Sequence, residues 1–279
     1  MVGFDTITIG KNKNFCRNGF NRSNKKMPLY IAHEEGVTVW DIWPAIRAAT
    51  ELLKSANAKG MQILNIGTLN NYKPETNSLE LQKYASVEWY IANAIYTPEM
   101  TDKEIPEEGG QQILAGSETK KLRAEQLLED LTKEPWRDPK QGRENHYDFL
   151  IVNSELYMPR GNGNRTIKVD AAVEPGICAV MSVTQFDYIR SDDKRTRHEH
   201  IIIGTAYHLG KLYGLESCNK ACAMNKQMES TDANSVRNYR SFLIHKNVLG
   251  KNLLCDDCRY KLNDYFNPTL FSKIRNIFG

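Results

Sequence analysis

Apolar and polar residues follow one another near the start of the chain in a pattern that predicts two strands joined by a helix. Between residues 40 and 55 the apolar positions recur at the spacing of one helix face. Short apolar runs at residues 27–32 and 61–67 flank this segment and predict strands. Strands that are joined by a helix through short links lie parallel in a right-handed crossover unit, so we expect that unit here.

The pattern continues with a second helix and further strands. Residues 119–132 carry leucines on one face and Lys and Glu on the other, which predicts a helix. Apolar runs at residues 147–152 and at the end of 171–182 predict buried strands, whereas residues 79–96 fit a helix and a strand equally. The tract 101–118 is rich in Glu, Gly and Pro and predicts a surface loop. This order of elements predicts an α/β fold, with a mixed sheet packed on two or three helices.

A glycine-rich segment at residues 160–165 reads Arg-Gly-Asn-Gly-Asn-Arg. A phosphate-binding loop would need Gly-Lys-Ser/Thr and a helix directly after it, and the segment has neither. A hairpin turn is therefore the better interpretation.

Composition narrows the class of protein. The 279 residues are 41% hydrophobic and 25% charged, which is ordinary for a soluble globular protein. The formal net charge of +3 is too near balance to indicate a nucleic-acid or membrane partner. There is no apolar run long enough to cross a bilayer and no signal-peptide pattern, so we expect a cytoplasmic protein with reduced thiols.

Residues 1–27 are rich in Lys, Arg and Asn. A basic terminus can grip phosphates, but a solvated, flexible arm is the simpler interpretation. Cys16 lies in this arm, and we interpret it as an unpaired surface thiol.

Four of the six cysteines form two short pairs, which are Cys218 with Cys222 and Cys255 with Cys258. Two such pairs supply four thiolates to a tetrahedral structural zinc, at S–Zn distances of about 2.3 Å and with no open position for a substrate. Four buried thiols, or two disulfides, are the alternatives. We expect one structural zinc per chain.

Residues 207–218, Tyr-His-Leu-Gly-Lys-Leu-Tyr-Gly-Leu-Glu-Ser-Cys, precede the first cysteine pair. Together with Cys222-Ala223-Met224 and the later Cys-x-x-Cys, this stretch resembles the archaemetzincins, a family of zinc metallopeptidases related to the metzincins. The Leu-Gly of residues 209–210, the turn glycine Gly214 and Met224 match the family's pattern. The resemblance implies a metzincin-like mixed sheet with helices and a C-terminal four-cysteine structural zinc site.

The family's catalytic zinc ligands are not retained in this frame. Tyr207 falls at the first histidine of HExxH, His208 at the catalytic glutamate, Lys211 at the second histidine and Ser217 at the third ligand. A catalytic zinc needs imidazole or carboxylate ligands and a general base, and these four residues do not supply them. An ammonium at a ligand position repels Zn²⁺, and we expect Lys211 to pair with Glu216 instead.

The resemblance also suggests how the chain divides. We expect a flexible arm at residues 1–27, an archaemetzincin-like α/β domain at residues 28–217, and a zinc-binding subdomain packed on it at residues 218–279. The polar stretch 228–247 is longer than the corresponding part of the family and predicts an inserted loop that leads into a helix. A short amphipathic helix is expected within residues 260–278.

The triplet His198-Glu199-His200 suggests a second metal site, with His208 as a further ligand. On a helix, however, residues two apart point about 200° away from each other, which argues for ordinary polar residues. Cys178 lies in an apolar run and has no evident base beside it, so a core thiol is a better interpretation than a nucleophile.

Three functions are compatible with these patterns. The first is a catalytically inactive pseudopeptidase that binds a peptide or protein partner along the strand of Cys178. The second is an active metallopeptidase or other hydrolase with a metal site rebuilt from residues such as His198, His200, His208, Glu199 and Glu216. The third is a scaffold or assembly protein. We favour the first, because all of the usual catalytic ligands are replaced.

Overall fold

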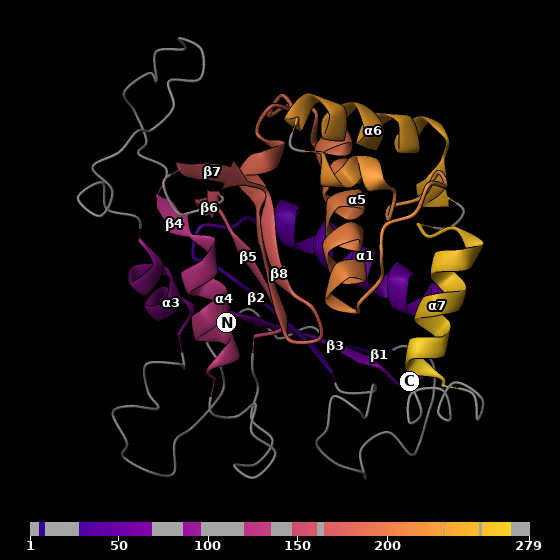
Figure 1. Ribbon diagram of the computed structural model, residues 1–279, viewed down its shortest axis with the longest axis horizontal. Coiled ribbons are helices and arrows are strands. Elements are labelled where there is room, and N and C mark those ends of the chain that lie inside the picture. Colours follow the sequence, from indigo (N-terminus) through magenta and orange to yellow (C-terminus); the bar gives the residue numbers. More distant parts are fainter. Residues whose placement is uncertain are drawn as a thin grey trace.

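The main sheet of the described chain has the strand order β1-β3-β2-β5-β9-β8 in the computed structural model (Figure 1). The residues that the structure describes are 6–8, 28–68, 86–95, 120–134, 147–160, 165–230, 232–250 and 253–268. The strands of this sheet are β1 (Thr6–Thr8), β2 (Leu29–His33), β3 (Gln62–Gly67), β5 (Phe149–Val152), β8 (Ala171–Glu174) and β9 (Cys178–Ser182). β2, β3, β5 and β9 run parallel, whereas β1 and β8 are antiparallel to their neighbours, so the sheet is mixed as predicted.

The crossover predicted at the start of the chain is confirmed. Helix α1 (Val39–Ser55) connects β2 to β3, which pair in parallel with Leu29 opposite Ile63. The buried face of α1 is made of small and branched residues such as Ala45, Ala49 and Leu52, which have no exposed surface. Small side chains let α1 lie close to its neighbours, above all to α5 (Lys194–Leu212), and the burial of this face explains the periodicity in the sequence.

A second sheet corrects one helix boundary. Its strands are β4 (Lys121–Arg123), β6 (Glu155–Arg160) and β7 (Arg165–Val169), in the order β4-β6-β7. The helix predicted over residues 119–132 is wrong in its first turn, because Leu122 pairs with Leu156 in this sheet and α4 (Ala124–Thr132) begins only afterwards.

Three further predictions concern segments near this second sheet. β6 and β7 form the predicted hairpin, whose turn at residues 161–164 lies outside the described residues. The ambiguous segment around residues 79–96 contains a helix, α3 (Val87–Ala94). The loop predicted at residues 101–118 also lies outside the described residues.

The apolar run at residues 171–182 forms two strands. β8 and β9 are antiparallel and turn through Gly176, whose φ of 75° suits glycine. β9 has β5 on one side and β8 on the other, so the idea of a binding edge along the strand of Cys178 is wrong and the edge strand is β8. Cys178 itself has no exposed surface, as predicted for a core thiol.

The N-terminal segment contributes a strand. Within residues 1–27, where an arm was expected, Thr6–Thr8 form β1 against β3. The remainder of that segment, including Cys16, lies outside the described residues.

The C-terminal helices pack onto the same core as the sheet. These elements are η5 (Val183–Phe186), α5 (Lys194–Leu212), η6 (Lys226–Glu229), α6 (Ala233–His245), η7 (Val248–Gly250) and α7 (Asp256–Phe266). Ile46, Leu209, Met224 and Leu262 belong to one continuous cluster of buried apolar side chains, which crosses the expected boundary at residue 217. Among the described helices, none has the length and apolar character needed to cross a bilayer.

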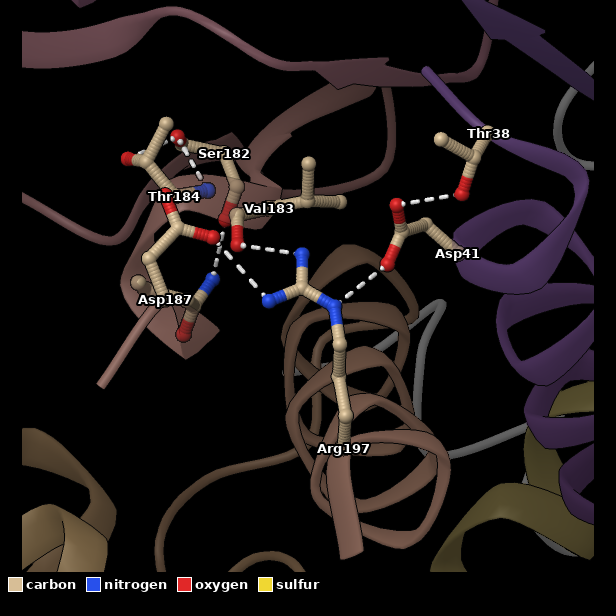
Figure 2. A network of polar contacts seen from close by, with 8 residues as sticks. Thr38, Asp41, Ser182, Val183, Thr184, Asp187 and Arg197 are labelled. Carbon is tan, nitrogen blue, oxygen red and sulfur yellow. Dashed lines mark hydrogen bonds and ion pairs between the residues drawn. The ribbon is translucent and has the colours of Figure 1, made fainter. Parts of the chain in front are cut away.

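Arg197 fixes the start of α5 to two other elements (Figure 2). Its Nε donates to Asp41 Oδ1 at 2.8 Å and its Nη1 to Asp187 Oδ1 at 3.0 Å, while Nη2 lies 3.4 Å from the carbonyl oxygen of Val183. Asp41, in the first turn of α1, also accepts a hydrogen bond from Thr38 at 2.8 Å. Because Asp41 and Arg197 are only 7% and 20% exposed, these charge-assisted bonds hold α5 in register with α1.

Candidate site on helix α5 and its cysteine cage

Helix α5 is the element that positions the candidate site. Its N-cap, Asp193, accepts a hydrogen bond from the Thr196 amide at 3.1 Å, and the helix ends before Gly214, whose φ is 77°. A Cβ atom added to Gly210 would lie only 2.3 Å from Met224 Sδ. Glycine at this position therefore lets the segment that follows the first cysteine pair lie directly against α5.

The four cysteines come together as predicted. The Sγ atoms of Cys218, Cys222, Cys255 and Cys258 all lie within 4.8 Å of one another. Cys218 Sγ is 3.2 Å from Cys222 Sγ and 4.0 Å from Cys255 Sγ, and all four thiols are free, so the alternative of two disulfides is not found. Sulfur atoms about 2.3 Å from the centre of a tetrahedron lie about 3.8 Å apart, so this cage can hold a metal ion.

The backbone around the cage supports thiolate ligands. Cys255 is the N-cap of α7 and Cys258 lies in its first turn, where the helix dipole and amide groups stabilise negative charge. The pKa of Cys222 is lowered to about 5, chiefly because the Cys258 thiol donates a hydrogen bond to it and also because backbone amides of Cys255 and Met224 donate. A thiolate is thus favoured at Cys222, whereas burial raises the pKa of Cys218 to about 11 and the hydrogen bond to Cys222 raises the pKa of Cys258.

The two cysteine loops are also joined outside the cage. The Ala223 amide donates to the Leu253 carbonyl oxygen at 2.9 Å, and Lys220 pairs with Asp257 at 2.8 Å. Tyr239, from α6, lies 3.3 Å from the carbonyl oxygen of Lys220. These contacts preset the distance between the two pairs, which is what a structural metal site requires.

Three of the four residues that the motif aligns with the catalytic positions of archaemetzincins, Tyr207, Lys211 and Ser217, lie together with Glu229 in what we call the Lys211 cluster. Lys211 Nζ donates to Ser217 Oγ at 2.9 Å and to Glu229 Oε1 at 2.5 Å, and Ser217 Oγ donates to the same carboxylate oxygen at 2.5 Å. The Tyr207 ring lies below the ammonium, with its centroid 5.7 Å from Nζ. The hydrogen bond from Lys211 is the main cause of the lowered pKa of Glu229.

The predicted ion pair between Lys211 and Glu216 is wrong. Glu216 is 84% exposed and lies 3.4 Å from Lys261 of α7, while Lys211 turns to Glu229. The chain folds back after Ser217, because the Cys218 amide donates to the Met224 carbonyl oxygen and the Lys226 amide to that of Cys218. This reversal brings η6 and its Glu229 to the side chains of α5.

His208, the fourth of these positions, contacts Tyr207 but forms no hydrogen bond with the Lys211 cluster. It is 7% exposed, its Nε2 atom has no hydrogen-bond partner among the described residues, and its ring stacks edge-on against Tyr207 at 5.0 Å. Burial is the main cause that lowers its pKa to about 3, with the cations Arg240 and Lys211 adding to it. His208 is therefore a neutral core imidazole at neutral pH and takes no part in the Lys211 cluster.

His200, another histidine of α5, is held by hydrogen bonds. His200 is 2% exposed, with Nδ1 2.7 Å from the Tyr188 hydroxyl and Nε2 3.5 Å from Ser241 Oγ. In the described part of the chain, the cysteine cage is the one group of three or more His, Cys, Asp or Glu side chains close enough to share an ion. The described residues therefore bring no rebuilt site together from His198, His200 and His208, which agrees with the helical geometry.

The sequence patterns missed two residues of this region. Glu229 completes the Lys211 cluster, and Arg240 of α6 is buried to 2% exposure beside α5. The cysteine spacing offered a signal for Glu229, since a cage between residues 218 and 258 forces the chain after Cys222 to return to α5. Nothing in the polar stretch around Arg240 distinguished it from solvated residues.

Comparison with known proteins returns structures of one kind. No protein-family model and no curated protein matches the chain. It is similar to the archaemetzincin of Methanopyrus kandleri, at 16% identity and a TM-score of 0.47 over 86% of this chain and 96% of that one. It is also similar to the archaemetzincin of Archaeoglobus fulgidus complexed with malonate, at 16% identity and a TM-score of 0.42 over 83% and 98% of the two chains.

A third similar structure is a zinc-dependent peptidase from Methanocorpusculum labreanum, at 15% identity and a TM-score of 0.41 over 84% of this chain and 99% of that one. The resemblance to archaemetzincins that the motifs indicate is thus found again in the search with the structure. At these identities and TM-scores it carries no conclusion about what this chain binds or catalyses.

Proposed function

We propose that this chain binds an extended segment of a peptide or protein partner along the edge of β8 and does not hydrolyse it. The observation that supports this most directly is the Lys211 ammonium, which lies between Ser217 and Glu229 where the archaemetzincin-like frame would place metal ligands. We further propose that the cysteine cage holds one structural zinc per chain.

The side chains of Lys211, Tyr207 and Glu229 are unsuited to hold a catalytic metal. Lys211 is a cation, and its carboxylate partner Glu229 is already used in the ion pair. Burial is the main cause that raises the pKa of Tyr207, so its phenolate, the form that binds metal, is disfavoured. A water-activating zinc needs three neutral or anionic ligands, and a cation among them opposes its binding.

The edge of β8 offers backbone groups for a partner. The Ser182 amide donates to the Asp170 carbonyl oxygen at 3.0 Å, so alternation along the antiparallel ladder turns the amides of Ala171 and Val173 away from β9. Among the described strands, none pairs with that outer side. An extended peptide adds to such an edge through main-chain hydrogen bonds.

Free thiols in the cage are typical of proteins in the reducing cytoplasm, where we propose that this protein acts.

The experiment is a peptide array probed with the zinc-loaded protein, followed by titration calorimetry and mass spectrometry of the peptides that bind. We expect binding without cleavage. Ala171→Pro removes one outward amide and should weaken binding about three- to tenfold, the value of a single hydrogen bond, whereas the matched variant Ala171→Ser keeps the amide and the affinity.

Two outcomes would contradict this proposal. Cleavage that stops on chelation and returns on addition of zinc would show that the chain is an active metallopeptidase. An array on which no peptide is retained above background would remove the binding function.

A further inference from the structure

We infer that the half-buried Arg237 and the exposed Tyr188, backed by the buried Arg240, bind a carboxylate of the peptide that lies on β8. This inference rests on the proposed function, because it names the chemistry of the same ligand. The carboxylate is that of an Asp or Glu side chain or of the peptide's C-terminus.

Arg237 forms no direct ion pair with a described carboxylate, although Asp232 lies close enough for Arg237 to help lower its pKa. Its guanidinium carbon lies 4.2 Å from the centre of the Tyr188 ring, and Tyr188 is 38% exposed. No described carboxylate lies within 4.0 Å of Arg237, although most other arginines of α5 and α6 have one. A guanidinium stacked on an aromatic ring is held in place while its N–H groups stay available, which favours recognition of a planar anion.

Arg240, one turn further along α6, is also incompletely neutralised. Its Nη2 donates to Gln185 Oε1 at 2.6 Å, and the side chain also contacts the Tyr188 hydroxyl. Its closest described carboxylate, Asp170, is 3.5 Å away and 38% exposed, and the buried Nε atom has no hydrogen-bond partner among the described residues. A buried charge is costly unless it is paired and hydrogen-bonded, so the site as described lacks negative charge.

The carboxylates near the two arginines leave donors of both unused. Asp170 lies 3.5 Å from Arg240 Nη2, and Asp232 lies close enough for Arg237 to help lower its pKa, but it forms no ion pair with Arg237. His200 adds no positive charge at neutral pH, because its pKa is lowered to about 4, chiefly by burial. A carboxylate placed beside Arg237 would accept hydrogen bonds from guanidinium N–H groups that the described residues do not engage.

The cluster lies at the correct place for a peptide on β8. Asp170 directly precedes the strand, and its contact with Arg240 joins the start of β8 to α6. Figure 1 shows α6 at the end of the molecule where β7 leads into β8. A peptide paired with the outward amide of Ala171 therefore has one of its side chains or its terminus next to Arg237 and Tyr188.

The test uses the zinc-loaded protein and the peptides retained on the array. Each peptide is compared with versions in which Glu is replaced by Gln, Asp is replaced by Asn, and the C-terminal carboxylate is amidated. The first two substitutions test side chains and the third tests the terminus. We expect one of the three to reduce the affinity of wild-type protein about tenfold.

The protein variant is Arg237→Gln, because this half-buried side chain lies outside the apolar core, whereas replacement of the buried Arg240 would disturb the fold. Arg237→Gln should lower the affinity for the acidic peptide about tenfold and leave the affinity for the neutral peptide unchanged. Lys246→Gln, on an exposed cation at the end of the same helix, is the matched control and should alter neither affinity.

The outcomes separate this inference from the proposed function. Peptides that bind equally well with and without carboxylates, or an Arg237→Gln variant no different from Lys246→Gln, would overturn the inference and leave peptide binding intact. Absence of any peptide binding would overturn both.

Discussion

The close approach between Gly210 and Met224 predicts a mutational effect whose sign depends on the background. A Cβ atom at Gly210 would lie 2.3 Å from Met224 Sδ and 3.2 Å from its Cε. A carbon and a sulfur atom in van der Waals contact lie about 3.5 Å apart, so the thioether of Met224 would have to move by about 1.2 Å. Met224 has no exposed surface and its carbonyl oxygen is fixed by the Cys218 amide, so little space is available for that movement.

Two terms of opposite sign decide the free energy of unfolding of Gly210→Ala. Overpacking a core costs about 1 to 3 kcal/mol, whereas alanine favours a helix interior over glycine by about 1 kcal/mol. We therefore expect a net destabilisation of about 0 to 2 kcal/mol in the wild-type background. In a Met224→Ala background the obstacle is absent, so the same substitution should stabilise by about 1 kcal/mol.

The assay is urea unfolding at 25 °C of the four zinc-loaded proteins of this double-mutant cycle, with zinc content measured for each. The coupling energy should be about 1 to 3 kcal/mol. Gly204→Ala is the matched control, since a Cβ there would meet Phe186 at 3.0 Å and not Met224, so Met224→Ala should leave its effect unchanged. If Gly210→Ala stabilises equally in both backgrounds, the close packing of the cysteine segment on α5 is refuted.

Two further predictions concern the cage and the buried histidine. Cys255→Ser should lose zinc and most of the roughly 10 to 16 kcal/mol of apparent folding free energy that such a site contributes, whereas the control Cys178→Ala should keep its zinc. Metal analysis and thermal unfolding of both variants test this prediction. Unchanged zinc content in Cys255→Ser would contradict the cage. The pKa of His208 is about 3 in the folded protein and near 6.5 in the unfolded chain. Below about pH 6.5 the unfolded chain therefore binds more protons than the folded protein, and stability decreases as the pH is lowered. Between about pH 7 and pH 5.5 this histidine should account for a loss of about 1 kcal/mol at saturating zinc, which His208→Leu should abolish. An equal loss in both proteins would contradict a buried neutral imidazole.

Elements that depend on local pattern could be predicted from the sequence. The β2-α1-β3 crossover rests on apolar periodicity and short links, and both are visible within about forty residues of sequence. The cysteine cage rests on residue type and spacing, which specify metal-binding chemistry with little dependence on the rest of the fold. β4 was missed because Leu122 fits a helix face as well as it fits a three-residue strand.

Long-range partners could not be predicted in the same way. The pair Lys211–Glu216 looked favourable by proximity in sequence, but the side chain of Glu216 points to solvent and the chain reversal after Cys218 supplies Glu229 instead. Arg240 shows the same limit, since its burial depends on Gln185 and Phe186, which lie more than fifty residues earlier. Its stretch of sequence is polar, so burial there is decided by tertiary packing and not by local pattern.

The buried cluster that continues from the sheet through α5 to the cysteine segment has a consequence for how the protein comes apart. Ile46 of α1, Leu209 of α5 and Leu262 of α7 share this cluster, so residues 218–268 cannot detach without exposing the inner face of α5 to water. The chain should melt as one cooperative unit, and proteolysis near residue 217 should give two fragments that are unable to fold apart. The C-terminal segment is therefore an integral part of the fold, and its stability depends on the same core as that of the sheet.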